Sequence, residues 1–154
     1  MLRDAYQTLL DAAATVGSDR VPPPGEWNAD QILAHVSIIN AATIATVASV
    51  TAGAITTYDN RLSQDTWTLN NTIALAGGNK GLQDRIRHQS DALCALVGPT
   101  LSEEELNTLI PARLLSNDEL LVDRPMPLRD IINGLAESEL PGHTQQLQSL
   151  RRGH

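Results

Sequence analysis

Hydrophobic residues recur at spacings of three and four along four stretches of the chain, which predicts four principal helices. The first helix ends at Gly17, and the second follows the proline-rich linker at residues 21–27 and is capped by Asn28 or Asp30. The third helix ends at Gly98, and the fourth begins after Pro127. The residues that line one side of each helix are, in chain order, Leu2, Tyr6, Leu9, Leu10 and Ala13; Ile32, His35, Val36, Ile39 and Ala42; Leu82, Ile86, Leu93, Leu96 and Val97; and Leu128, Ile131, Ile132, Leu135, Leu147 and Leu150.

The segments between these helices are polar or irregular. A polar stretch surrounds Trp67, and Ser102 with Glu105 forms a capping-box signature for a short helical turn. Two short extended runs flank Asn117 and Asp118, which indicates a small hairpin. We therefore predict an all-α fold, a four-helix bundle with a small irregular or hairpin insertion before the last helix, formed by residues 1–154 as a single domain.

The second helix lies in a stretch without charged residues, from Val36 to Tyr58, that is long enough to raise the question of a membrane span. Serine, threonine and asparagine recur through it, and its main apolar residue is alanine, so transfer into lipid gains little. We interpret it as a buried helix. Its small side chains allow another helix to approach closely, either within the fold or across a homodimer interface.

Composition narrows the classes of function. The chain has 154 residues, 42% hydrophobic and 19% charged, which is typical of a globular domain. A net charge of −7 argues against binding to nucleic acid or to an anionic membrane. The single cysteine, Cys94, excludes an intrachain disulfide, and the N-terminus has an acidic residue, Asp4, and no export signal, so we expect a cytoplasmic protein.

Three polar residues occupy positions where the helical pattern expects apolar ones. His35 lies between Ile32 and Ile39, and Glu139 and His143 extend the stripe of the last helix. An ionised carboxylate buried alone costs several kcal/mol. A carboxylate at such a position must therefore be exposed, protonated, paired or bound to a cation. Residues four apart share one helix face, so Glu139 and His143 could bind one metal ion together with His35.

Two imidazoles and one carboxylate are three ligands for Zn²⁺ that leave a fourth position for water or a substrate. The same set suits Fe²⁺ or Ni²⁺. Such a site lowers the pKa of a bound water or thiol and so provides a nucleophile at neutral pH. Pro141 lies between two of the three residues, and a proline within a helix can kink it, which would either spoil or aim the geometry.

Two segments resemble a known family. PPPGEWNADQILAHV, with Trp27 eight positions before His35, resembles the second-helix signature of the DinB/YfiT-like metalloprotein superfamily, and SELPGHTQQLQSLR is similar to its last helix. Glu139, in place of the commoner histidine, resembles the variant in the N-terminal domain of mycothiol-dependent maleylpyruvate isomerases. The resemblance implies metal ligands at His35, Glu139 and His143. It also implies a metal-dependent transferase or hydrolase that acts on a small electrophile, often with mycothiol or bacillithiol as the cosubstrate.

The resemblance leaves alternatives open. The chain ends just after the last helix and has no further domain, so we do not expect the isomerase reaction itself. A lone inward histidine is more often a satisfied core residue, and Glu139 could be exposed. The alternative function is a non-catalytic helical binding module with a degenerate metal site.

Other polar residues have simpler interpretations. Asp84 and His88 are expected to be a surface pair, Cys94 a small buried hydrophobe, and Trp27 a packing residue at the entry of the second helix. Gln146 could hydrogen-bond a ligand or face water. We assign no role to Arg124, Arg129 or His154.

Overall fold

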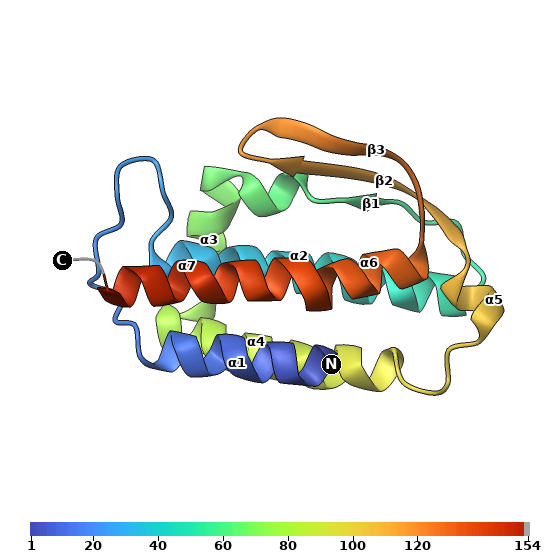
Figure 1. The fold of residues 1–154 in the computed structure, drawn as a ribbon, viewed down its shortest axis with the longest axis horizontal. Coiled ribbons are helices and arrows are strands. Elements are labelled where there is room, and N and C mark those ends of the chain that lie inside the picture. Colours follow the sequence, from blue (N-terminus) through green and yellow to red (C-terminus); the bar gives the residue numbers. More distant parts are fainter. Residues whose placement is uncertain (153–154) are drawn as a thin grey trace.

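The computed structural model describes residues 1–152 as a set of long helices with a small sheet along one side (Figure 1). His154 lies outside the described residues. The elements are, in chain order, α1 (Leu2–Ala14), α2 (Ala29–Thr51), β1 (Tyr58–Asp59), the 3-10 helix η1 (Arg61–Gln64), α3 (Thr66–Ala76), α4 (Asn79–Leu96), α5 (Glu103–Leu106), β2 (Leu109–Ser116), β3 (Glu119–Pro127), α6 (Leu128–Gly134), the π-helical turn η2 (Leu135–Glu139) and α7 (Leu140–Arg152).

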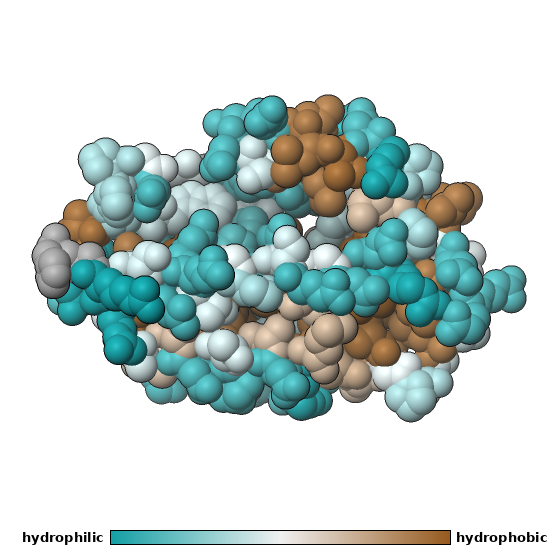
Figure 2. All heavy atoms as spheres, viewed as in Figure 1, coloured by the Kyte–Doolittle hydropathy of each residue, from teal (hydrophilic) through white to brown (hydrophobic). Residues whose placement is uncertain are grey.

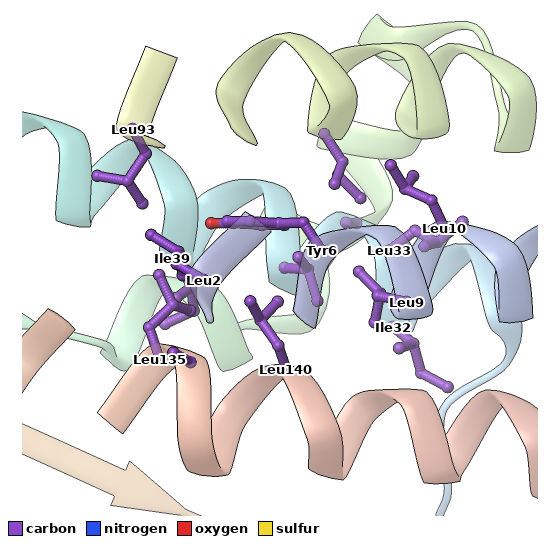
Figure 3. Packing of buried hydrophobic residues seen from close by; sticks show 14 of the residues in the cluster. Leu2, Tyr6, Leu9, Leu10, Ile32, Leu33, Ile39, Leu93, Leu135 and Leu140 are labelled. Carbon is purple, nitrogen blue, oxygen red and sulfur yellow. The ribbon is translucent and has the colours of Figure 1, made fainter. Parts of the chain in front are cut away.

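The core lies between α1, α2, α4 and the continuous helix formed by α6, η2 and α7 (Figures 1 and 3). Tyr6 and Leu9 on α1, Ile32 and Leu33 on α2, and Leu140 on α7 are almost completely buried. Full burial of such a side chain contributes roughly 1.5–3 kcal/mol. This core holds α2 and α7 side by side, and these are the helices that carry His35 and His143.

Helix α2 begins at a reciprocal cap. The Asn28 side chain accepts from the Gln31 N–H at 2.8 Å, and the Gln31 side chain accepts from the Asn28 N–H at 3.0 Å. By length and composition α2 could cross a membrane, but 61% of its most apolar window is buried within the fold. A buried core helix passes the same test, so this helix gives no reason to place the protein in a membrane.

The sheet has the order β1–β2–β3. β1 pairs with β2 in parallel, Tyr58 opposite Ala112, and β2 pairs with β3 in antiparallel orientation. The hairpin turn consists of Asn117 and Asp118, both with positive φ (50° and 64°), as a two-residue type I′ turn requires. The hairpin expected at these two residues is therefore present, with strands of 8 and 9 residues.

The predicted all-α four-helix bundle is wrong. A three-stranded mixed sheet is part of the fold, which makes the protein α+β. The strand outside the predicted hairpin, β1, has only two residues, too few to show an alternating pattern, and it pairs with β2, which is distant in the sequence. The polar stretch around Trp67 also contains α3, which was missed because Leu69 is its only fully buried residue.

Hydrophobic side chains also gather on the outside of the molecule, over the β2–β3 hairpin (Figure 2). The large apolar residues of the hairpin that are exposed are Leu109, Leu120 and Leu121. Leu120 and Leu121 lie near the turn and Leu109 at the other end of the hairpin.

Candidate metal centre

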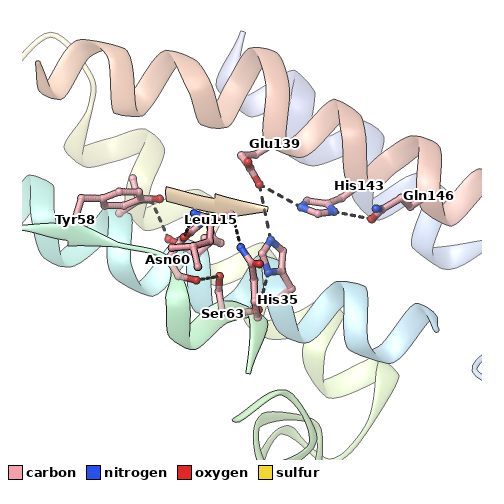
Figure 4. Close-up of polar contacts among 11 residues, drawn as sticks. His35, Tyr58, Asn60, Ser63, Leu115, Glu139, His143 and Gln146 are labelled. Carbon is pink, nitrogen blue, oxygen red and sulfur yellow. Dashed lines mark hydrogen bonds and ion pairs between the residues drawn. The ribbon is translucent and has the colours of Figure 1, made fainter. Parts of the chain in front are cut away.

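Three helical segments bring His35, Glu139 and His143 together (Figure 4). His35 lies on α2, Glu139 is the last residue of η2, and His143 lies one turn later on α7. One Glu139 oxygen, Oε2, is 3.3 Å from Nε2 of His143 and 3.8 Å from Nε2 of His35. One ligand atom from each of the three residues lies within 4.8 Å of the other two.

The His35 ring is held in place at Nδ1, the nitrogen that faces away from Glu139. Its Nδ1 lies 2.7 Å from the backbone carbonyl oxygen of Ser63, in η1. A carbonyl oxygen only accepts, so Nδ1 carries a proton and Nε2 is the ring nitrogen that faces the centre. The Trp27 ring packs against it, with ring centroids 4.9 Å apart. Trp27 was expected as a packing residue at the entry of the second helix. In the structure it is in contact with His35, a candidate ligand.

His143 is oriented in the same way by its own helix. Gln146 Oε1 accepts a hydrogen bond from His143 Nδ1 at 2.8 Å. Gln146 therefore hydrogen-bonds a candidate ligand, and it is also exposed to solvent. Both imidazoles thus have a partner on Nδ1 that directs Nε2 toward Glu139, which is the outer-shell arrangement found around metal-binding histidines.

Glu139 reaches the centre because of the π-turn η2. Between Leu135 and Glu139 the helix makes a wider turn than an α-helix, and Pro141 follows immediately in α7. Proline has no N–H and its ring crowds the carbonyl four residues earlier, and a π-turn accommodates both effects. The helix passes Pro141 without separating Glu139 from His143.

The π-turn also changes which residues face the core. After Ala136 the next buried residues are Leu140 and Thr144, one position later than the positions 139 and 143 extrapolated from the sequence, whereas Leu147 and Leu150 are buried as predicted. Glu139 and His143 consequently lie beside the core stripe. The expectation that Glu139 points into the core is wrong, since its side chain is 46% exposed.

The electrostatics of the cluster favour an ionised carboxylate. The His143 imidazole, and after it the His35 imidazole, lower the pKa of Glu139 to about 2, against the opposing effect of partial burial. Glu139 is thus negatively charged at neutral pH. A cation placed between this carboxylate and the two Nε2 atoms would be attracted by the negative charge and could bind both imidazoles.

The donor set and its dimensions fit one metal ion. Four-coordinate Zn²⁺ with bonds of about 2.0–2.2 Å holds its ligand atoms about 3.4 Å apart. The two separations that involve Glu139 Oε2, 3.3 and 3.8 Å, lie close to this value, and all three ligand atoms lie within 4.8 Å of one another. His35, Glu139 and His143 therefore form a group that could hold a metal ion.

The centre opens to solvent on one side. The His35 side chain is 4% exposed and that of His143 is 13% exposed, whereas Glu139 is nearly half exposed. Solvent therefore reaches the cluster at Glu139, whereas His35 is shielded. Access from one side, with ligands fixed on the other, is typical of an open metal site.

Tyr58 lies near the cluster without belonging to it. Its hydroxyl is 3.2 Å from Oγ1 of Thr43, which itself donates to a backbone carbonyl, so the phenol donates to Thr43. Burial raises the pKa of Tyr58, and the negative charge of Glu139 adds to this effect. The phenol is therefore neutral and cannot act as a base near neutral pH.

The remaining sequence candidates lie elsewhere. Asp84 pairs with Lys80 and Arg87 on the surface of α4, and Arg129 pairs with Glu103. Cys94 is half-buried against the core. Arg124 lines a groove of about 340 Å³ on the sheet, formed by residues 57–59, 111–113 and 123–125, and none of the three candidate ligands contributes to that groove.

Sequence reasoning missed Ser63, and with it the loop that fixes His35. Ser63 acts through its backbone carbonyl, which any residue provides, so the sequence carries no signal for this role. Comparison of the chain with protein-family models, curated proteins and solved structures gives no match.

Proposed function

We propose that this chain is a cytoplasmic metalloprotein that binds one divalent transition metal through His35, Glu139 and His143. Zn²⁺ suits the ligand set best, with Ni²⁺ and Fe²⁺ as alternatives. Its reaction is transfer or hydrolysis, in which a low-molecular-weight thiol or water attacks a small electrophile. The observation that carries the proposal is the convergence of three donor atoms within 4.8 Å, with both imidazoles already directed by hydrogen bonds on their far nitrogens.

When bound, a metal ion supplies a Lewis acid that lowers the pKa of a thiol or water in its free position. His35 and His143 bind as neutral donors and Glu139 adds one negative charge. Two positive charges and one negative charge leave a net charge of +1, so the centre attracts a reactant with a single negative charge, such as a thiolate.

The resemblance to the DinB/YfiT-like superfamily suggests which thiol serves as the cosubstrate. The motif positions that match that superfamily are the three residues that cluster here, which supports the proposal. Mycothiol or bacillithiol as cosubstrate rests on the resemblance alone. The geometry supports a thiolate and water equally well as the nucleophile.

The first test measures metal content. We expect untagged wild-type protein to bind close to one equivalent of a transition metal, as isolated or after reconstitution, and His35→Ala and Glu139→Ala to bind less than about one-tenth equivalent. Glu137→Ala is a matched control, since Glu137 is exposed on the same turn, and His88→Ala is the corresponding histidine control. Wild-type protein that stays below about one-tenth equivalent after reconstitution contradicts the proposal.

The second test separates catalysis from binding. Metal-loaded protein and protein stripped with a chelator are compared for consumption of a thiol in the presence of a small electrophile, and for hydrolysis without the thiol. Turnover in the loaded protein alone, lost in Glu139→Ala and retained in Glu137→Ala, is the expected result. Equal rates in loaded and stripped protein contradict a metal-dependent reaction.

The second candidate function is a non-catalytic interaction module. It is favoured by exposed apolar residues outside the centre: Trp67 and Leu75 on α3, each 73% exposed, and Leu120 and Leu121 on the hairpin. A protein that binds no metal but associates through these residues would fit this function. Retained metal together with thiol-dependent turnover excludes it.

A further inference from the structure

A chain of hydrogen bonds connects the β2–β3 hairpin to His35, and Asn60 is its central residue (Figure 4). The Asn60 N–H donates to the Arg113 carbonyl at 3.2 Å, which continues the β1–β2 pairing. Its side chain then binds both backbone groups of Leu115, accepting from the N–H at 2.8 Å and donating to the carbonyl at 2.9 Å. Asn60 thus takes the place of one further residue of β1 and anchors the start of η1 to β2.

From Asn60 the connection runs through η1 to the metal centre. The Asn60 carbonyl accepts from the Ser63 hydroxyl at 2.6 Å and from the Ser63 N–H at 3.1 Å. The Ser63 carbonyl in turn accepts from Nδ1 of His35 at 2.7 Å. Asn60, Ser63 and His35 are all buried, with 7%, 1% and 3% exposure, so water cannot easily replace any of these bonds.

These contacts determine where His35 Nε2 points. The ring is held on one face by Trp27 and at Nδ1 by the Ser63 carbonyl, and that carbonyl is part of a single short turn. If the turn moves, the carbonyl moves and the imidazole follows it. The anchor of the turn to the sheet is Asn60, together with the Gln64 side chain, which also donates to the Leu115 carbonyl.

We propose that Asn60 is a positioning residue for the metal ligand His35, and that it couples the β2–β3 hairpin to the metal centre. This inference rests on the proposed metal site. Asn60 touches neither the metal nor a substrate, and it acts only through Ser63. Because coupling between two sites is reciprocal, metal binding strengthens the Asn60–Leu115 contact by the same factor by which that contact strengthens metal binding.

The test compares Asn60→Ala with the wild-type protein and with Asn70→Ala, a control at an exposed asparagine on α3. Zn²⁺ affinity is measured by chelator competition, and the geometry of the centre by the visible spectrum of the Co²⁺-loaded protein. We expect Asn60→Ala to bind Zn²⁺ about 10-fold more weakly, within the range for residues that orient metal ligands, and to change the Co²⁺ spectrum. Asn70→Ala should match wild type in both measurements.

A second measurement needs no variant, so it holds even if Asn60→Ala does not fold. Hydrogen exchange of the Leu115 amide, which donates to Asn60, is followed in wild-type protein with and without Zn²⁺. We expect about 10-fold slower exchange with Zn²⁺, equal to the affinity loss in Asn60→Ala, while the Ile110 amide on the same strand changes less.

The outcomes separate the two proposals. If wild-type protein binds no metal, the proposed function itself fails. If wild-type protein binds Zn²⁺ but folded Asn60→Ala has the same affinity and Co²⁺ spectrum, only the positioning role is wrong. Unchanged exchange at Leu115 on addition of Zn²⁺ overturns the coupling in the same way.

Discussion

In metal-free protein, Glu139→Gln tests whether the two imidazoles stabilise the carboxylate without a cation. The imidazoles of His143 and His35 hold the pKa of Glu139 near 2, against an ordinary value of 4.5. At about 1.4 kcal/mol per pKa unit, this difference corresponds to about 3 kcal/mol. Because 46% of the Glu139 side chain is exposed, solvent screens much of the interaction, and we expect a loss of about 1 kcal/mol in the free energy of unfolding near pH 6.

The sign of the pH dependence follows from proton binding. A carboxyl whose pKa is lower in the folded state binds fewer protons there than in the unfolded state, so its stabilisation is complete above the unfolded pKa of about 4.5. It is lost as the pH falls toward about 2. The difference in stability between wild type and Glu139→Gln should therefore shrink over this interval.

The assay is urea unfolding with a chelator present, followed by far-ultraviolet circular dichroism, at a series of pH values between about 6 and about 2.5. Glu137→Gln, on the same turn and exposed, is the matched control and should lie within about 0.5 kcal/mol of wild type. A Glu139→Gln protein that is more stable than wild type near pH 6 would refute the reasoning. Such a result would mean that the metal-free imidazoles repel the carboxylate.

Three further predictions concern the metal, the core and the surface. Zn²⁺ binding should weaken at acidic pH, because protons compete with the metal for its ligand atoms; titration of the protein with Zn²⁺ at several pH values measures this, and an affinity independent of pH contradicts it. Leu140→Ala should lower the free energy of unfolding by about 2–5 kcal/mol, since Leu140 is fully buried, whereas Leu75→Ala should change it by less than about 0.5 kcal/mol; similar losses in the two variants would argue against the described core. Helix α3 has no charged residue in a chain of net charge −7, which favours it as the contact of a homodimer. Trp67→Glu should therefore yield monomers in light scattering. A wild-type protein that is monomeric at all concentrations contradicts this prediction.

The hairpin turn and the helices other than α3 could be predicted because their signals are local. The α2 helix begins where the Asn28 cap places it, and the two turn residues with positive φ are an asparagine and an aspartate, which tolerate that conformation. The sheet could not be predicted as a whole, because Tyr58–Asp59 pairs with a strand more than fifty residues away and is too short to show a period. Pro125 and Pro127 also argue against a strand, although β3 is an edge strand, where prolines are tolerated.

The candidate ligands could be predicted because each is a side chain with the wrong polarity for its position. The residues that support them could not, since their contribution lies in the backbone or in long-range contacts. Ser63 offers a carbonyl to His35, and Asn60 acts on a strand 55 positions away. An asparagine in a polar stretch has no distinguishing neighbour in the sequence, so its role is visible only once the sheet is built.

The π-turn explains both the error about Glu139 and the form of the centre. Each residue of a helix rotates the chain by about 100°, so one extra residue before Leu140 shifts the core stripe from position 139 to position 140. With regular α-helical spacing, Glu139 would point into the core, where a carboxylate is costly and a substrate has no access. With the π-turn, Leu140 fills the core and Glu139 lies at its margin, where it contacts both histidines while 46% of its side chain is exposed. Pro141, which the sequence presents as a risk to the site, is therefore compatible with the local geometry that makes the site accessible.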